Sequence, residues 1–205
     1  ERLAAYKGLL LAAISLGWSE ARQHRLFAAF QRELPRQFNA DGGHIERSSV
    51  AQFIAVRDLV DLRTAFRSAE LAAPQGLAEA IEAAASMLRL FRHGDGRFAH
   101  FNGEADTEAT AIDLLLSRSG ARGRTPTSAP QTGFERLAGG KTIVLVDAGA
   151  AGAHAGTLSF EMSHGKERLV VNCGGYEGPS SDWRTAVRRT AAHSTLVIED
   201  RSSAE

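Results

Sequence analysis

Two histidines near the C-terminal end of the sequence, His154 and His193, are the side chains best placed to do chemistry. His154 comes just before the run 157–162, and His193 just before the run 195–198. Both runs alternate or are β-branched, which is typical of half-buried strands. If these strands are neighbours in a sheet, both imidazoles reach one place, where they can exchange a proton near neutral pH or bind a transition metal. The plainer interpretation, that each histidine only caps a strand, stays open.

A loop near position 45 carries a second candidate, His44 with Glu46. There an exposed imidazole would be free to approach the carboxylate of a sugar. The alternative is a loop that only opens the next helix, which the sequence starts at Ser48 or Ser49. Three other histidines lie in turn or edge contexts and are expected to be solvated: His93, His100 and His164.

An arginine cluster beside a tryptophan is a third candidate, for ligand binding. Arg184, Arg188 and Arg189 follow Trp183 at helical spacing, and Arg47 is expected to join them across a cleft. Guanidinium groups bind carboxylate or sulfate in a bidentate fork, and an aromatic ring can stack on a sugar face, which together suit an acidic glycan. The alternative is an ordinary surface cluster, neutralised by the carboxylates close to it in sequence.

The composition of the 205-residue sequence limits the classes of partner. It has 24 Lys and Arg against 24 Asp and Glu, so neither nucleic acid nor an anionic membrane is expected as a partner. The longest apolar run, 8–14, is too short to cross a bilayer. The single cysteine, Cys173, excludes an intrachain disulfide and is expected to be a small buried hydrophobe in a strand. Because the sequence opens on Glu1 inside a helical pattern and stops just after a strand, it is expected to be a piece of a longer protein.

Hydrophobic periodicity predicts helices first and strands later. Apolar residues recur at helical spacing over 3–14, 19–38, 49–72 and 74–91, and Pro35 suggests that the second helix kinks or ends early. After His93 the pattern predicts a short strand at 97–101, a helix at 107–117, and strands at 141–146, 157–162, 168–172 and 194–198. The predicted organisation is a helical domain at 1–118, a linker at 119–133 and a β domain at 134–205.

Six segments, in this order along the chain, resemble the heparinase II/III family. They are 41–48 (DGGHIERS), 101–103 (FNG), 154–161 (HAGTLSFE), 171–174 (VNCG), 183–184 (WR) and 189–195 (RTAAHST). The resemblance implies an α+β multidomain fold, in which part of an incomplete α/α toroid is followed by an antiparallel β-sandwich, here truncated. It also implies a periplasmic or secreted lyase whose partner is an acidic polysaccharide, cleaved in the cleft between the two domains.

The resemblance assigns roles for cleavage of a uronic-acid-containing chain by β-elimination. That reaction needs a group to neutralise the uronate carboxylate, a base for the C5 proton and an acid for the departing oxygen. By resemblance, His44 assists the carboxylate, and Tyr176 is the candidate acid or base. The residues expected to bind the substrate are Arg47, Trp183, Arg184 and Arg188.

The resemblance further implies a structural metal, zinc or another divalent ion, held by His154, Asn172 and His193. Two glycines depart from the family pattern: Gly152 stands where the family has a catalytic histidine, and Gly156 where it has an aspartate. A scaffold of helices that only binds protein partners would predict a broad exposed apolar patch. Two other hypotheses concern the site itself. The chain belongs either to a polysaccharide lyase that cleaves uronic-acid-containing glycans, or to a catalytically inactive acidic-glycan-binding protein of the same fold.

Overall fold

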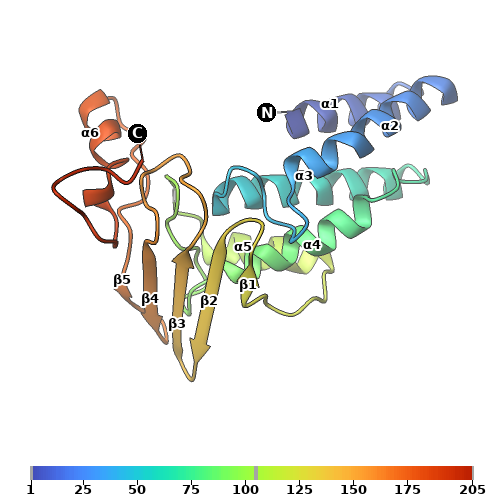
Figure 1. Cartoon of the computed structure of the whole chain (residues 1–205). Helices are drawn as coiled ribbons and strands as arrows, with labels where there is room; N and C mark the ends of the chain where they lie inside the picture. The colour runs from blue at the N-terminus through green and yellow to red at the C-terminus, as the bar shows by residue number, and fades with distance from the viewer. Residues whose placement is uncertain (1, 104–105, 205) are drawn as a thin grey trace.

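Five helices precede an antiparallel sheet in the computed structural model, which describes residues 2–103 and 106–204 (Figure 1). The helices are α1 (Arg2–Ser15), α2 (Glu20–Gln37), α3 (Ser49–Ser68), α4 (Leu77–Leu90) and α5 (Ala109–Ser119). The strands are β1 (Ser128–Ala129), β2 (Phe134–Gly139), β3 (Thr142–Asp147), β4 (Phe160–His164) and β5 (Glu167–Val170). A short helix, α6 (Ser181–Ala186), and a 3-10 turn (Thr190–Ala192) follow. This order confirms the predicted α+β fold with its helices first.

The helices pack through the apolar faces that periodicity predicted. α1 packs on α2 and α3, α3 on α4, and α5 on both α3 and α4. The largest side chains at these contacts are fully buried, including Leu10, Phe30, Leu59 and Phe66. Burying one such side chain stabilises the fold by roughly 1.5–3 kcal/mol, so this core fixes the helical part.

Two helix ends differ in how well the sequence predicted them. α3 begins as expected, because the Ser48 hydroxyl accepts a hydrogen bond from the backbone N–H of Ala51 at 3.0 Å. The early end predicted at Pro35 is wrong, since α2 continues to Gln37. The last turn is held in place because Leu34 is buried and its carbonyl accepts from the N–H of Phe38 at 3.0 Å.

The five strands form an antiparallel meander in the order β1-β2-β3-β4-β5. Two tight turns close the hairpins β2-β3 and β4-β5, and each uses a glycine with positive φ, Gly140 at 58° and Gly165 at 57°. The sequence predicted β3, β4 and β5 but missed β2, because residues 134–139 do not alternate. β1 lies inside the stretch predicted to be a linker and pairs with β2.

Two predicted strands are wrong. Residues 97–101 contribute only an isolated bridge between Arg92 and Phe98. Residues 194–198 lie beside the start of β4 but do not form a strand with it. The N–H of Ser194 donates to the side chain of Asn172, and one backbone hydrogen bond joins the two segments, from the N–H of Phe160 to the carbonyl of Ser194.

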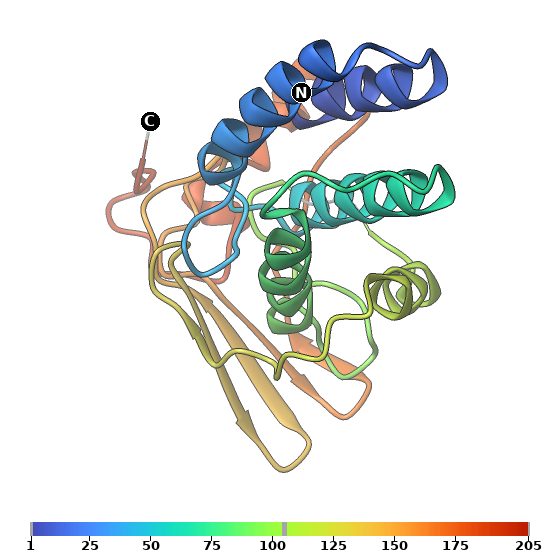
Figure 2. The ribbon, with the colours of Figure 1, turned by 90° about the vertical axis from the view of Figure 1, so that its right-hand side faces the viewer.

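The end of α4 and the loop that follows it pack against one face of the sheet, and α1 and α2 lie farther away (Figure 2). The contact is aromatic: the Phe134 ring of β2 lies 4.9 Å from the ring of Phe91 and 5.4 Å from that of Phe101, between centroids. The opposite face is open and apolar, with Leu137 63% and Leu169 58% exposed. Within the described part of the chain, every helix is too short or too polar to cross a membrane.

Candidate functional site

The structure brings His154 and His193 together, which confirms the convergence predicted from the two strand-like runs. Nδ1 of His154 lies 3.2 Å from Nε2 of His193, and the rings stand almost perpendicular at 86°. The other nitrogen of His193, Nδ1, lies 2.9 Å from the carbonyl oxygen of Arg189. A carbonyl oxygen only accepts, so Nδ1 of His193 carries a proton and donates it to Arg189.

Burial keeps His154 uncharged. Desolvation, the neighbouring His193 and the cationic Arg188 together lower the pKa of His154 from 6.5 to about 4. The imidazole is therefore neutral at physiological pH. A neutral ring can accept a proton or share one with its partner, which a cationic ring cannot.

A pocket of about 520 Å³ opens beside His154 and carries positive charge. Arg188 and Arg189 line it together with Thr185 and residues 152–155. Arg188 is held there because its Nε donates to the carbonyl of Ala153 at 3.0 Å. Two guanidinium groups next to a neutral imidazole suit a ligand that carries a carboxylate or sulfate group.

The loop 101–103 is seated between the segment that carries His154 and the segment that carries Tyr176. A Cβ added to Gly103 would lie 2.8 Å from Nε2 of His154, and one added to Gly175 would lie 2.5 Å from the carbonyl oxygen of Gly103. Gly103 also has a φ of +88°, which favours glycine. Only glycine fits at these two positions, so the segments that carry His154 and Tyr176 pack closely against the loop 101–103.

Arg47 fastens this loop to the sheet. Its Nε donates to the Thr132 carbonyl at 2.7 Å, its Nη1 to the carbonyl of Ala150, and its Nη2 forms an ion pair with Asp147. Nδ2 of Asn102 in turn donates to the carbonyl of Arg47 at 2.9 Å. The guanidinium that the sequence assigned to substrate is thus used inside the molecule, where it joins the helical part to the sheet.

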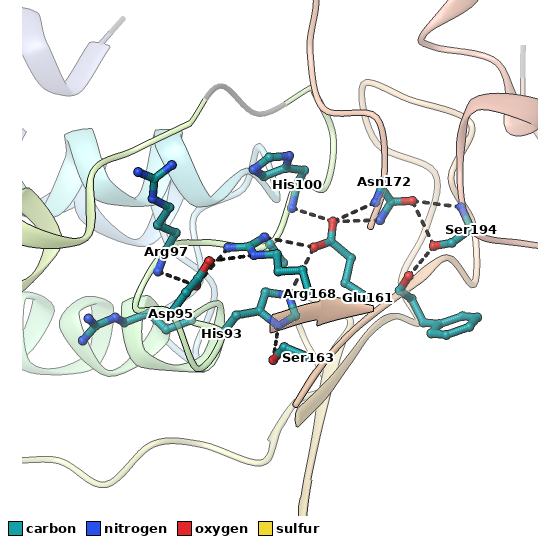
Figure 3. A network of polar contacts seen from close by, with 12 residues as sticks. His93, Asp95, Arg97, His100, Glu161, Ser163, Arg168, Asn172 and Ser194 are labelled. Carbon is teal, nitrogen blue, oxygen red and sulfur yellow. Dashed lines mark hydrogen bonds and ion pairs between the residues drawn. The ribbon is translucent and has the colours of Figure 1, made fainter. Parts of the chain in front are cut away.

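Glu161 is the centre of a buried polar network that the sequence analysis did not find (Figure 3). Its carboxylate accepts from the backbone N–H of His100 at 2.8 Å and from the N–H and Nδ2 of Asn172 at 3.1 and 3.2 Å. Burial alone would raise the pKa of Glu161, but the hydrogen bonds from His93, Asn172 and His100 outweigh it and hold the pKa below 4.5. The only signal in the sequence was the place of Glu161 at the end of the segment 154–161, which begins with His154.

The same network contains His93, which was expected to be solvated. That expectation is wrong: the side chain is fully buried, with Nε2 3.1 Å from Glu161 and Nδ1 2.9 Å from the hydroxyl of Ser163. The loop that carries His93 packs against the β4-β5 turn, as the backbone of Gly94 leaves no room for a Cβ beside the carbonyl of Gly165. His93 therefore ties the helical part to the sheet rather than facing water.

The other two histidines differ from each other. His164 is exposed, as expected, and lies 3.0 Å from the hydroxyl of Thr142. His100 is only partly exposed, because its Nε2 contacts Asp106 at 2.9 Å.

Asn172 links the Glu161 network to the histidine pair. Its Oδ1 accepts from the N–H of Ser194 at 3.1 Å and from the Ser194 hydroxyl at 3.2 Å (Figure 3). Ser194 follows His193 directly, so the chain from Glu161 through Asn172 positions the backbone next to the second imidazole.

The remaining predicted residues lie apart from one another. His44 is buried rather than exposed, because its backbone N–H is held by Gln52 at 2.6 Å and its ring packs on Phe38. Burial lowers the pKa of His44, and the carboxylate of Glu46 offsets part of this. His44 and Glu46 line a separate pocket of about 160 Å³.

Tyr176 and the arginines after it lie around α6. The Tyr176 ring stands 6.3 Å from that of Trp183, between centroids, and Trp183 is 61% exposed. Nη2 of Arg184 donates to the carbonyl of Pro179 at 3.3 Å. Cys173, expected to be buried in a strand, is exposed in the loop after β5, with Sγ 3.3 Å from the carbonyl of Gly174.

The donor set around the histidine pair does not fit a zinc site. Two nitrogens 3.2 Å apart could share a metal, but such sites take three or four protein ligands. Asn172, expected as the third ligand, uses its oxygen on Ser194. Within residues 2–103 and 106–204, His, Cys, Asp and Glu form no group of three or more that could hold a metal ion.

The chain is similar to known proteins in sequence and in fold. Residues 121–205 match the family model described as heparinase II/III-like, C-terminal. FtsZ-localized protein C of Caulobacter vibrioides is 31% identical over 170 residues, which are 80% of this chain and 29% of that protein. The chain therefore spans less than a third of the length of this relative.

Solved structures share the fold at lower identity. A crystal structure of heparinase III matches with a TM-score of 0.81 and 16% identity, over 98% of this chain and 39% of that one. A heparan sulfate lyase from Pedobacter heparinus matches with a TM-score of 0.77 and 19% identity, over 98% of this chain and 37% of that one.

Proposed function

We propose that the protein is polysaccharide lyase-like and acts on uronic-acid-containing glycans by β-elimination. Two similarities support this: residues 121–205 match the heparinase II/III-like C-terminal family, and the chain shares the fold of part of heparinase III. The observation that carries the proposal is the contact between His154 and His193, which lies beside a pocket lined by Arg188 and Arg189. Proton-handling groups and anion-binding groups are thus found at one place.

The proposed reaction uses the groups in that place together with Tyr176, which lies beside α6. Arg188 neutralises the uronate carboxylate, which makes the C5 proton more acidic. The imidazole pair of His154 and His193 accepts this proton, and the electrons of the C5–H bond form the C4=C5 double bond as the C4–O bond breaks. Tyr176 is the proposed donor of the proton that the departing oxygen takes. His44 is buried, so we give it the role of positioning the loop 44–47.

A catalytically inactive glycan-binding protein is the second candidate, and one observation favours it. A Cβ at Gly152 would lie 2.2 Å from Oδ1 of Asn102, so the place where the family has a catalytic histidine is filled by a neighbouring side chain. The relative in Caulobacter vibrioides is also named for its localisation with FtsZ rather than for a lyase activity.

The test is to incubate the full-length protein with uronic-acid polysaccharides, with and without sulfate, and to follow the ultraviolet absorbance of the unsaturated uronate product. Absorbance that rises with the wild type and is lost in His193→Gln supports the lyase; Arg201→Gln, at an exposed ion pair, is the matched control. Calorimetric binding without a rise supports the second candidate. Neither binding nor a rise with any glycan would overturn both.

The resemblance implies a bound zinc ion and a periplasmic or secreted location, and each is tested separately. Elemental analysis of the purified protein tests the first: because the donor set is incomplete, we expect less than one zinc per chain. Stoichiometric zinc that is lost in His193→Gln would contradict this expectation. Cell fractionation with an antibody against the chain tests the periplasmic or secreted location.

A further inference from the structure

A second arginine-lined pocket lies where α4, α5 and β2 meet, and it shares no lining residue with the pocket beside His154. It has a volume of about 360 Å³. Arg89 from α4, Arg92 from the loop after α4 and Arg136 from β2 line it, and Thr125 stands at its edge. We call this the arginine pocket.

The three guanidinium groups are held in place by backbone carbonyls. Nη1 of Arg136 donates to the carbonyls of Leu90 and Arg92 at 3.1 and 2.7 Å, at the end of α4. Nε of Arg92 donates to the carbonyl of Gly96 at 2.9 Å, and Nη2 of Arg89 to that of Ala121 at 2.5 Å. The groups are thus pre-organised, so a ligand would lose little affinity to ordering them.

The positive charge of the arginine pocket is only partly compensated. Among the described ion pairs of the three arginines the one carboxylate is Asp113, which pairs with Nη2 of Arg92 at 2.7 Å and is 63% exposed. Burial and the neighbouring Arg92 lower the pKa of Arg136. Like charges held together at a partly buried place cost free energy that a bound anion would recover.

One donor in the arginine pocket has no partner. Nη1 of Arg89 is buried and makes no hydrogen bond within the described residues. A buried donor on a charged group that lacks an acceptor is rare in folded proteins, because it loses its hydration without a replacement. This donor therefore points to a ligand that supplies oxygen atoms.

We propose that the arginine pocket binds a tetrahedral oxyanion, a sulfate or phosphate group. Guanidinium groups match such groups through paired N–H donors, and three of them line a cavity of this size. The sulfate group of a glycan and free phosphate share this chemistry. The proposal does not depend on lyase activity, since the site stands apart from the histidine pair.

The experiment is a thermal-unfolding titration of the full chain with sodium sulfate and sodium phosphate, at constant ionic strength set with sodium chloride. Wild type is expected to show a saturable rise in Tm with either anion, because ligand binding to the folded state stabilises it. Thr125→Glu places a carboxylate at the edge of the pocket without removing any of the hydrogen bonds that hold the three arginines. It is expected to raise Tm without added anion and to weaken anion binding at least about tenfold.

Ser19→Glu is the control, because Ser19 is exposed, makes no side-chain cap hydrogen bond and lies outside the pocket, at the start of α2. It is expected to keep the anion response of the wild type. Arg89→Gln gives a second, independent loss of affinity. Absence of a saturable rise in wild type, or equal responses in Thr125→Glu and Ser19→Glu, would overturn the proposal. A sulfated uronate oligosaccharide compared with its desulfated form then separates a glycan sulfate from free phosphate as the source.

Discussion

The guanidinium of Arg47 and the carboxylate of Asp147 form an ion pair that joins the loop before α3 to the end of β3. Both side chains are largely buried, 11% and 5% exposed. Burial raises the pKa of Asp147, and the adjacent Arg47 counteracts part of that rise. The pair matters for the site because the segment that follows Asp147 leads directly to His154.

Asp147→Asn is expected to destabilise the fold by about 2–4 kcal/mol, because it leaves a buried guanidinium without its counter-charge. Urea unfolding followed by circular dichroism measures this loss. Glu199 and Arg201 form an ion pair on the surface, with the Arg201 side chain 82% and the Glu199 side chain 73% exposed. Glu199→Gln removes this pair and should change the free energy of unfolding by less than about 0.5 kcal/mol. Equal effects of the two substitutions would contradict the structural role of Arg47.

Glu161 should make stability depend on pH in the acid range. Its pKa in the folded state lies below the ordinary value of 4.5, so the unfolded state binds more protons and the contribution of Glu161 is present above pH 4.5. This contribution is lost as the pH falls through the lowered pKa. Glu161→Gln is expected to cost about 2–4 kcal/mol at pH 7, and the difference from wild type should shrink between about pH 5 and pH 3.

Unfolding by guanidinium chloride at a series of pH values measures this dependence. Glu167→Gln, an exposed carboxylate on the same hairpin, is the control and should leave the profile close to that of the wild type. A difference between Glu161→Gln and wild type that stays constant from pH 7 to pH 3 would show that the network does not depend on the ionised carboxylate.

The helices were predictable from sequence because each shows its core face as an apolar periodicity, as Leu59 and Phe66 do in α3. The meeting of His154 and His193 was predictable because each comes just before an apolar run, although the second run is not a strand. The burial of His93 was not predictable, since its partner Glu161 is 68 residues away. Neither polar residue carries a periodic signal, and only tertiary packing brings them together.

Close backbone contact at the loop 101–103 gives a steric prediction. Gly175→Ala would place a Cβ 2.5 Å from the carbonyl oxygen of Gly103, so the backbone must shift. We expect a loss of about 1–3 kcal/mol, as for an overpacked core, together with lower affinity for any glycan bound beside His154. Thermal unfolding and calorimetric glycan binding measure the two effects.

Gly8→Ala is the control for this substitution. Gly8 lies in α1 with nothing within 4 Å of an added Cβ, so alanine should stabilise the fold by about 0.5–1 kcal/mol. If Gly175→Ala is as stable as the wild type, the loop 101–103 is not held as the structure describes.

The contact between His154 and His193 is tested most directly by the pH titration of the His154 imidazole, followed by NMR of selectively labelled histidine. The structure predicts a pKa of about 4 in the wild type, because burial, His193 and Arg188 all disfavour the charged ring. It predicts a higher pKa in His193→Gln, where one of these causes is gone. A His154 pKa near 6.5 in the wild type, unchanged by His193→Gln, would show that the two rings do not share a buried site.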